Sequence, residues 1–313
     1  PAGVTISNEV AVDITCFGAN DGTITITASG GTNPLAYSID GGTTFTNTTG
    51  IFTGLAANTY TVVVQDSNLC QTAGSVLTIS EPPALSIDSE LATDVLGCAG
   101  NLNGTITLTG SGGSGPISYS IDTINYQAGG SFTGLASGTY TVGIQDSAGC
   151  KLLGSTLTIN EPTMVVIDSE IIVDISCAGA SDGTITIVAS GGTGSYFYSI
   201  DGGTTLVNTT GVFSGLSPGS YDVFLIDTDT CVAQGSTFTL TDPPSISITS
   251  ETKTDIDCLG DADGTIDIVA TGGTAPLSYS IDTIDFTNTT GSFTNLDSGT
   301  YYIAVQDANG CTQ

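Results

Sequence analysis

The sequence contains no histidine, no arginine and no tryptophan, and its 313 residues include only two lysines, Lys151 and Lys253. Without histidine or arginine it lacks the usual general base and the usual side chain for binding oxyanions, so we expect no catalytic residues and no enzyme. The 31 acidic residues give a net charge of -29. A chain this acidic cannot neutralise phosphates or approach an anionic membrane surface, so nucleic acid is excluded as a partner.

Long apolar runs are also absent. No stretch of about twenty apolar residues occurs, so we expect no membrane insertion in this segment. No secretion signal opens the chain at Pro1. Apolar residues still make up 39% of the sequence, which is enough for packed cores and argues against disorder.

What is present is repetition. The segment Thr53–Cys70, TGLAANTYTVVVQDSNLC, recurs in similar form and ends at Cys150, Cys231 and Cys311. A second cysteine series stands at Cys16, Cys98, Cys177 and Cys258. The period near 80 residues is typical of small domains and predicts four repeats, over residues 1–81, 82–161, 162–242 and 243–313. The fourth repeat stops two residues after Cys311, so we expect its last strand to be missing and the chain to be an excerpt of a longer protein.

Local patterns predict strands throughout. Apolar and polar residues alternate in segments such as Thr23–Ala28, and glycine-rich turns separate these segments. In the first repeat we expect strands at residues 4–14, 23–28, 35–39, 59–65 and 75–79, and a short one around Phe52. About seven short strands per repeat indicate an all-β fold of four tandem immunoglobulin-like β-sandwich domains.

The linkers between repeats are short and rich in proline. They read SEPPALSI, NEPTMVVI and TDPPSISI. Proline stiffens the chain, and flexible Gly/Ser spacers are absent. We therefore expect the domains to stack head to tail as an elongated rod.

A tyrosine follows a leucine and a tight turn in every repeat. The four residues are Tyr60, Tyr140, Tyr221 and Tyr301. A tyrosine at the start of the sixth sandwich strand that bonds back to the preceding corner is a known device of immunoglobulin-like domains. We therefore expect a tyrosine corner in each repeat.

Several motifs together resemble the SprB-type repeat of cell-surface gliding adhesins. They are the Cys-x-Gly series, the (Asp/Asn)-Gly-Thr-Ile opening of the second strand, SGGT, Tyr-Ser-Ile-Asp, GTY and DxxGC. Departures are small: Asn295 replaces the corner glycine, and Leu69 and Thr230 replace glycine before the cysteine. The resemblance covers nearly the whole chain. It implies a very large, secreted, filamentous surface protein exported by the type IX system and used in adhesion and gliding motility, with no catalytic residues.

The eight cysteines show no metal-binding spacing, and two per repeat indicate disulfides in an extracellular setting. Pairing within a repeat, Cys16 with Cys70, is the obvious alternative. In an immunoglobulin-like topology, however, these two cysteines lie at opposite poles, and a disulfide needs Cα atoms within about 7 Å. Head-to-tail stacking instead favours three pairs between repeats: Cys16–Cys150, Cys98–Cys231 and Cys177–Cys311. Cys70 and Cys258 are then left for partners outside the segment.

Acidic residues recur at matching positions near the expected joints, including Asp13, Asp94, Asp174 and Asp255. Calcium prefers several oxygen ligands on flexible loops, so these carboxylates are weak calcium candidates. The alternative is that they are surface charges and turn caps. We therefore assign no cofactor, with calcium as a minor possibility.

The function favoured by these patterns is structural: a disulfide-stapled stalk of a surface-displayed adhesin. Its expected partners are neighbouring repeats of the same chain and other copies in a filament or bundle. The alternative is a module whose loops recognise an extracellular glycan or protein. A third reading, an accessory domain of an enzyme, is less well supported.

Overall fold

The computed structural model describes residues 3–258 and 260–313, and its regular elements there are all β-strands. The first repeat contains β1 (Thr5–Val12), β2 (Gly22–Ser29), β3 (Ala36–Ser38), β4 (Ile51–Leu55), β5 (Asn58–Gln65) and β6 (Gln71–Ile79). The second contains β7 (Ser86–Thr93), β8 (Gly104–Ser111), β9 (Ser118–Ser120), β10 (Ser131–Leu135), β11 (Gly138–Gln145) and β12 (Lys151–Ile159).

The later repeats follow the same order. The third contains β13 (Val166–Val173), β14 (Gly183–Ser190), β15 (Tyr196–Ser199), β16 (Val212–Leu216), β17 (Gly219–Asp227) and β18 (Val232–Leu240). The fourth contains β19 (Ser247–Thr254), β20 (Gly264–Thr271), β21 (Ser278–Ser280), β22 (Ser292–Leu296) and β23 (Ala304–Gln306).

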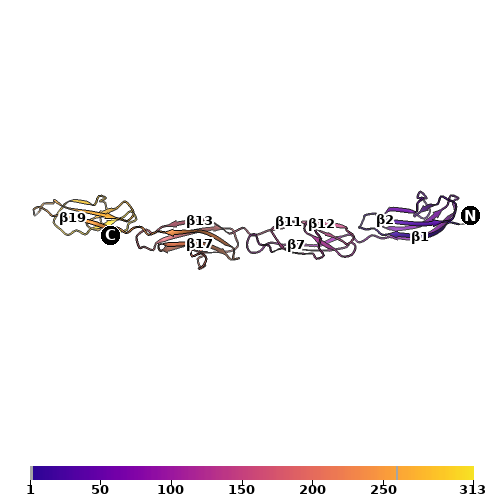
Figure 1. Ribbon diagram of the computed structural model, residues 1–313, viewed down its shortest axis with the longest axis horizontal. Helices are drawn as coiled ribbons and strands as arrows, with labels where there is room; N and C mark the ends of the chain where they lie inside the picture. The colour runs from indigo at the N-terminus through magenta and orange to yellow at the C-terminus, as the bar shows by residue number, and fades with distance from the viewer. Residues whose placement is uncertain (1–2, 259) are drawn as a thin grey trace. The chain divides into compact units, whose positions relative to one another are not determined.

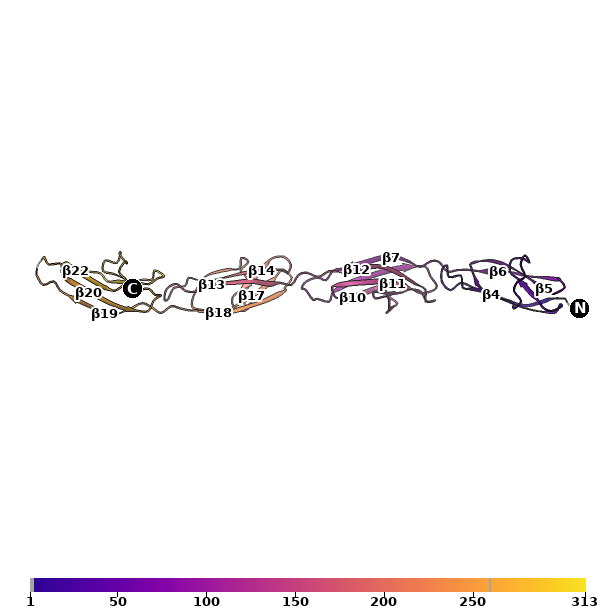
Figure 2. The same cartoon turned by 90° about the horizontal axis from the view of Figure 1, so that it is seen from above.

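Each repeat is a sandwich of two antiparallel sheets. In the first repeat one sheet has the order β1-β2-β4 and the other β3-β5-β6, and the second and third repeats copy this arrangement. Figure 1 shows β13 and β17 of the third repeat in opposite layers, and Figure 2 shows the same repeat turned by 90°. In the fourth repeat the second sheet comprises two strands, β21 and β23. The predicted all-β, immunoglobulin-like class is confirmed.

Period-2 alternation explains the cores. In β2 the residues Gly22, Ile24 and Ile26 are buried while the threonines between them face outward or lie at the margin. Val62 and Val64 of β5 meet them from the opposite sheet, and all four aliphatic side chains are less than 4% exposed. Equivalent clusters fill the other three repeats.

A glutamate closes one edge of each of the first three sandwiches. The pairing of β5 with β6 shifts register between Thr61 and Val63, which frees the backbone N–H of Ser75. That N–H donates to the Glu9 carboxylate of β1 at 3.0 Å. A Cβ on Gly74 would lie 2.0 Å from Glu9 Oε1, so the close approach requires glycine here. Glu90 and Glu170 bind Ser155 and Ser236 in the same way.

Each of the first three sandwiches has six strands, and the six of the first repeat match the six ranges that the sequence predicts. The segment after β3 forms a crossing held by side chains instead of a ladder. Asp40 Oδ1 accepts the N–H groups of Thr43 and Thr44, and Asn47 Oδ1 accepts those of Thr49 and Gly50. In the third repeat, bonds led by the Ser199 hydroxyl lower the pKa of the equivalent Asp201 to about 2. These carboxylates therefore stay ionised and keep the crossing folded.

The chain forms two compact units. One comprises the residues up to Leu96 together with Gly100–Glu161, and the other comprises Gly97–Ala99 and Pro162–Gln313. The main division falls between Glu161 and Pro162, where the sequence predicts the boundary of the second and third repeats. The individual repeat boundaries and the rod-like stacking stay predictions.

Candidate functional site: the disulfide-bonded joints

A buried aspartate organises the turn that carries the second cysteine of each repeat. Asp146 is 4% exposed, and its Oδ1 accepts the backbone N–H groups of Ala148 and Cys150 at 3.0 and 2.9 Å. Its Oδ2 accepts the N–H of Ser114, on the SGGSG loop, at 2.8 Å. The carboxylate therefore fixes both the turn and the neighbouring loop. Asp66, Asp227 and Asp307 make the same three contacts.

The turn does not depend on a disulfide. Cys70 is a free, exposed thiol, yet its N–H donates to Asp66 at 2.9 Å as in the bonded repeats. The N–H of Thr32, followed by that of Cys70, holds the pKa of Asp66 below its ordinary value. The turn therefore presents its sulfur in a conformation set by the carboxylate.

The first cysteine of each repeat lies in the Cys-x-Gly loop, and in the first three repeats an acidic residue from the following linker anchors this loop. Gly18 N–H donates to Glu81 Oε2 at 2.9 Å, and Gly100 N–H donates to Glu161 Oε2 at 2.7 Å. Gly179 N–H donates to Asp242 Oδ1 at 3.0 Å. The linker acid thus ties the cysteine loop to the point where its own repeat ends.

Sequence reasoning missed this contact. Its signal is present in the linkers, because each of them carries an acidic residue directly before proline: Glu81, Glu161 and Asp242.

Three disulfides join the two kinds of loop: Cys16–Cys150, Cys98–Cys231 and Cys177–Cys311. These are the three pairs that the sequence favours, on the expectation that the two cysteines of a repeat lie at opposite ends of its sandwich. Their Cα atoms lie 5.7, 5.3 and 5.6 Å apart, within the normal range. The structure brings neither Cys70 nor Cys258 to another cysteine, and both are exposed.

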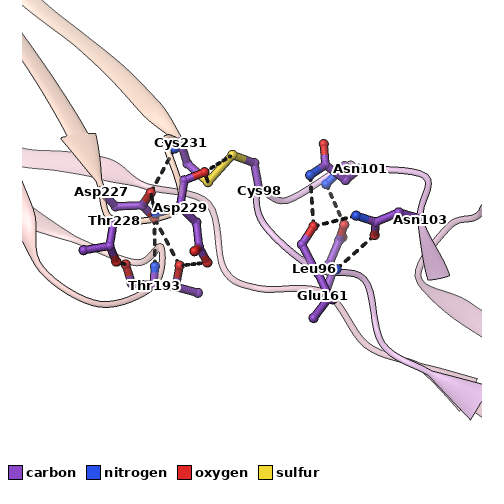
Figure 3. Close-up of a disulfide and its surroundings, with 11 residues drawn as sticks. Leu96, Cys98, Asn101, Asn103, Glu161, Thr193, Asp227, Thr228, Asp229 and Cys231 are labelled. Carbon is purple, nitrogen blue, oxygen red and sulfur yellow. Dashed lines mark hydrogen bonds between the residues drawn. A yellow bond between two sulfur atoms is a disulfide. The ribbon is translucent and has the colours of Figure 1, made fainter.

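Figure 3 shows the Cys98–Cys231 joint. The tip Gly97–Ala99 belongs to the second compact unit, and the flanking Leu96 is held by Asn103, whose Oδ1 accepts the Leu96 N–H at 2.9 Å. At the Cys177–Cys311 joint, Asn309 Nδ2 also donates to the carbonyl of Ser176 at 2.9 Å. The Cys177 loop and the Cys311 turn are therefore joined by a polar contact as well as by the disulfide.

The four tyrosines form corners. Tyr60 Oη donates to the Ala56 carbonyl at 2.9 Å and Tyr140 Oη to that of Ala136 at 3.0 Å. Tyr221 and Tyr301 donate in the same way to the carbonyls of Ser217 and Asp297. Each bond fixes the turn that leads into the strand ending at the aspartate–cysteine turn.

The four calcium candidates have other contacts. Asp13, Asp94 and Asp174 accept the backbone N–H groups of Ser80, Asn160 and Thr241 at 2.8, 2.8 and 3.1 Å. Asp255 pairs with Lys253 at 2.8 Å. Over residues 3–258 and 260–313, no three His, Cys, Asp or Glu side chains are grouped as metal ligands. The structure therefore does not bring these four aspartates together, and calcium binding stays a prediction that titration in the presence of a chelator would test.

The sequence matches one family model. The SprB repeat matches residues 8–44, 92–125, 169–205 and 250–286, once in each repeat, and each match includes a Cys-x-Gly loop. No curated protein matches the sequence. In the described part of the chain, no helix has the length and apolarity needed to cross a membrane.

Three solved structures align with nearly all of the chain, at low sequence identity and low TM-score. The N-terminal eight Ig domains of Down Syndrome Cell Adhesion Molecule isoform 1.30.30 match 99% of this chain and 48% of their own, at 14% identity and a TM-score of 0.33. The chain thus spans about half the length of that structure. The human desmocollin-1 ectodomain matches 100% of this chain and 78% of its own, at 14% identity and a TM-score of 0.32. Surface layer protein SbsC, domains 1–6, matches 98% and 50%, at 12% identity and a TM-score of 0.25.

Proposed function

Because the chain carries four SprB repeats, we propose that it is a stalk segment of a large, surface-displayed adhesin, in which disulfides join consecutive repeats and support adhesion or gliding. The observation that carries this proposal is the pairing of the cysteines. Each disulfide spans 133 or 134 residues, well beyond the length of one repeat. A cross-link of this span stabilises the joint between consecutive domains. Such a joint is useful to a chain of tandem domains that bears tension along its length.

An extracellular, non-enzymatic role agrees with the chemistry of the chain. Three disulfides are typical of an oxidising compartment. The sequence has no histidine or arginine for acid–base work or oxyanion binding. Its strong negative charge favours solubility and mutual repulsion over adsorption to anionic surfaces.

In the three disulfides, the cysteine of a Cys-x-Gly loop pairs with the cysteine of an aspartate-held turn in the next repeat. We expect the two free thiols to pair in the same way. Cys70 lies on an aspartate-held turn like those of Cys150, Cys231 and Cys311. Cys258 begins a turn in which the Asp261 N–H donates to its carbonyl, as Ala19 does to Cys16. In the cellular protein we expect Cys70 to pair with a Cys-x-Gly cysteine of another repeat, and Cys258 to pair with a DxxGC cysteine.

The test is a non-reducing peptide map of the protein taken from the surface of the cells that produce it. Mixed disulfides at Cys70 and Cys258 would support the stalk. Antibodies against this segment should label intact cells. Labelling only after permeabilisation, or free thiols at both positions, would contradict the proposal.

The alternative, a module that recognises an extracellular glycan or protein, draws on one feature. Ile124 and Ile284 occupy the same turn in the second and fourth repeats and are 78% and 83% exposed. An apolar tip repeated in this way is a plausible contact surface. Binding of the four-repeat chain to a glycan array, abolished by Ile124→Ser with Ile284→Ser, would favour this alternative.

A further inference from the structure

The three disulfides overlap along the chain. Cys98 lies inside the loop closed by Cys16–Cys150, and Cys177 lies inside the loop closed by Cys98–Cys231. Overlap arises because each bridge spans 133 or 134 residues while the cysteines recur about every 80. Disulfides within single repeats would leave every linker outside a loop.

Overlap creates a short covalent route between the ends. The route runs along residues 1–16, crosses to Cys150, follows the chain to Cys177, crosses to Cys311 and ends at Gln313. It contains about 44 residue-to-residue steps, and a fully extended chain covers at most about 3.6 Å per step. Residues 17–149 and 178–310 are not on it.

We propose that the overlapping disulfides act as a covalent extension limiter, so that unfolding of the repeats under tension cannot lengthen the chain beyond this route. With about 6 Å for each disulfide crossing, the fully stretched oxidised chain reaches about 170 Å. The same 313 residues without disulfides reach about 1,100 Å. This inference goes beyond the proposed function, because it follows from the connectivity alone.

The Cys98–Cys231 disulfide has a different role in the extension limiter from the other two disulfides. Cys98–Cys231 is not on the shortest route, so its loss leaves the limit unchanged. If Cys177–Cys311 is lost, the shortest route instead runs back from Cys150 to Cys98 and across to Cys231, with about 150 steps and a length of about 550 Å. Cys98–Cys231 is therefore a reserve link for either neighbour.

The experiment is single-molecule stretching of the 313-residue chain between handles at its two ends. Cys70→Ser and Cys258→Ser are introduced throughout to prevent thiol exchange. Three oxidised forms are compared: this background, the background with Cys98→Ser and Cys231→Ser, and the background with Cys177→Ser and Cys311→Ser. Fully reduced background protein is the fourth sample, and a non-reducing peptide map of each sample establishes its pairs.

We expect maximum contour lengths of about 170, 170, 550 and 1,100 Å in that order. The two double variants are matched controls, because each removes one disulfide and only one of them lies on the route. Extension of the oxidised background well beyond 170 Å would overturn the proposal. Equal lengthening of the two double variants, or a peptide map with different pairs, would also overturn it.

Discussion

The buried carboxylate of Asp146 offers the sharpest test of how the joint is built, through Asp146→Asn. Asparagine keeps the shape and one acceptor oxygen, so the N–H groups of Ala148 and Cys150 retain their partner. The N–H of Ser114 would instead face the amide NH2 group and lose its acceptor. The substitution therefore removes one charge-assisted hydrogen bond and leaves a buried donor unpaired.

The expected cost is about 2 kcal/mol, since hydrogen bonds to charged groups contribute about 1.5–3 kcal/mol and an unpaired buried donor costs a similar amount. A loss of about 2 kcal/mol corresponds to a roughly 30-fold change in the local opening equilibrium. Hydrogen exchange measured by mass spectrometry on the intact oxidised chain measures this local opening equilibrium directly. The peptides that contain Ser114 and Cys150 should exchange about 30-fold faster, and peptides from the fourth repeat should be unchanged.

Asp88→Asn is the matched control. Asp88 is an exposed aspartate of the same repeat, and it accepts the Ser111 hydroxyl at 2.9 Å, a bond that an asparagine oxygen can also accept. The control removes the same charge and should change exchange less than about twofold. If the two variants accelerate exchange equally, charge and not hydrogen-bond geometry governs the turn, and our reasoning about Asp146 is wrong.

Three further predictions concern the tyrosine corner of the second repeat, the buried Asp66 carboxylate and the two free thiols. Tyr140→Phe should destabilise the second repeat by about 1 kcal/mol through loss of its bond to the Ala136 carbonyl, and an unchanged urea midpoint would refute this. Because the pKa of Asp66 is lowered on folding, its stabilising effect is complete above the unfolded-state pKa of about 3.9 and is lost as pH falls through the folded value. After correction for the intrinsic exchange rate at each pH, protection of the amides around Thr32 should therefore fall only below pH about 4, and a loss of protection near neutral pH would contradict the assignment. The isolated, oxidised 313-residue chain, without the partner cysteines expected in the cellular protein, should gain iodoacetamide labels at Cys70 and Cys258 alone, and labelling at Cys98 would show that the middle disulfide does not form.

The sequence predicts much of the fold because each signal is local. Strand alternation places Ile24 and Ile26 in the core, and the GTY motif places Tyr140 at its corner. The crossing after β3 adds no strand, because Asp40 and Asn47 accept its backbone N–H groups through side-chain oxygens. Asx bonding of this kind competes with a β-ladder and leaves no periodic pattern.

The site was only partly predictable for a related reason. The period and the expected positions of the cysteines at opposite ends of each sandwich favour the three pairs between repeats, with pairing inside a repeat as the alternative. The anchors Glu81 and Asp146 depend on contacts over 63 and 32 residues of separation, and no local pattern encodes these. Glu9 is similar, since its role emerges only when a bulge in another strand releases the N–H of Ser75.

The wide spacing of each disulfide also sets the order in which the cysteines of a newly synthesised chain can pair. Cys16 has no partner until Cys150 has emerged, by which time Cys70 and Cys98 are already present. Oxidation that outpaced folding would trap one of these earlier thiols. The aspartate-held turn gives its cysteine a fixed direction before any bond forms, as Cys70 shows. Within this segment the disulfides can therefore form only in the order Cys16–Cys150, Cys98–Cys231 and Cys177–Cys311 as the chain is made.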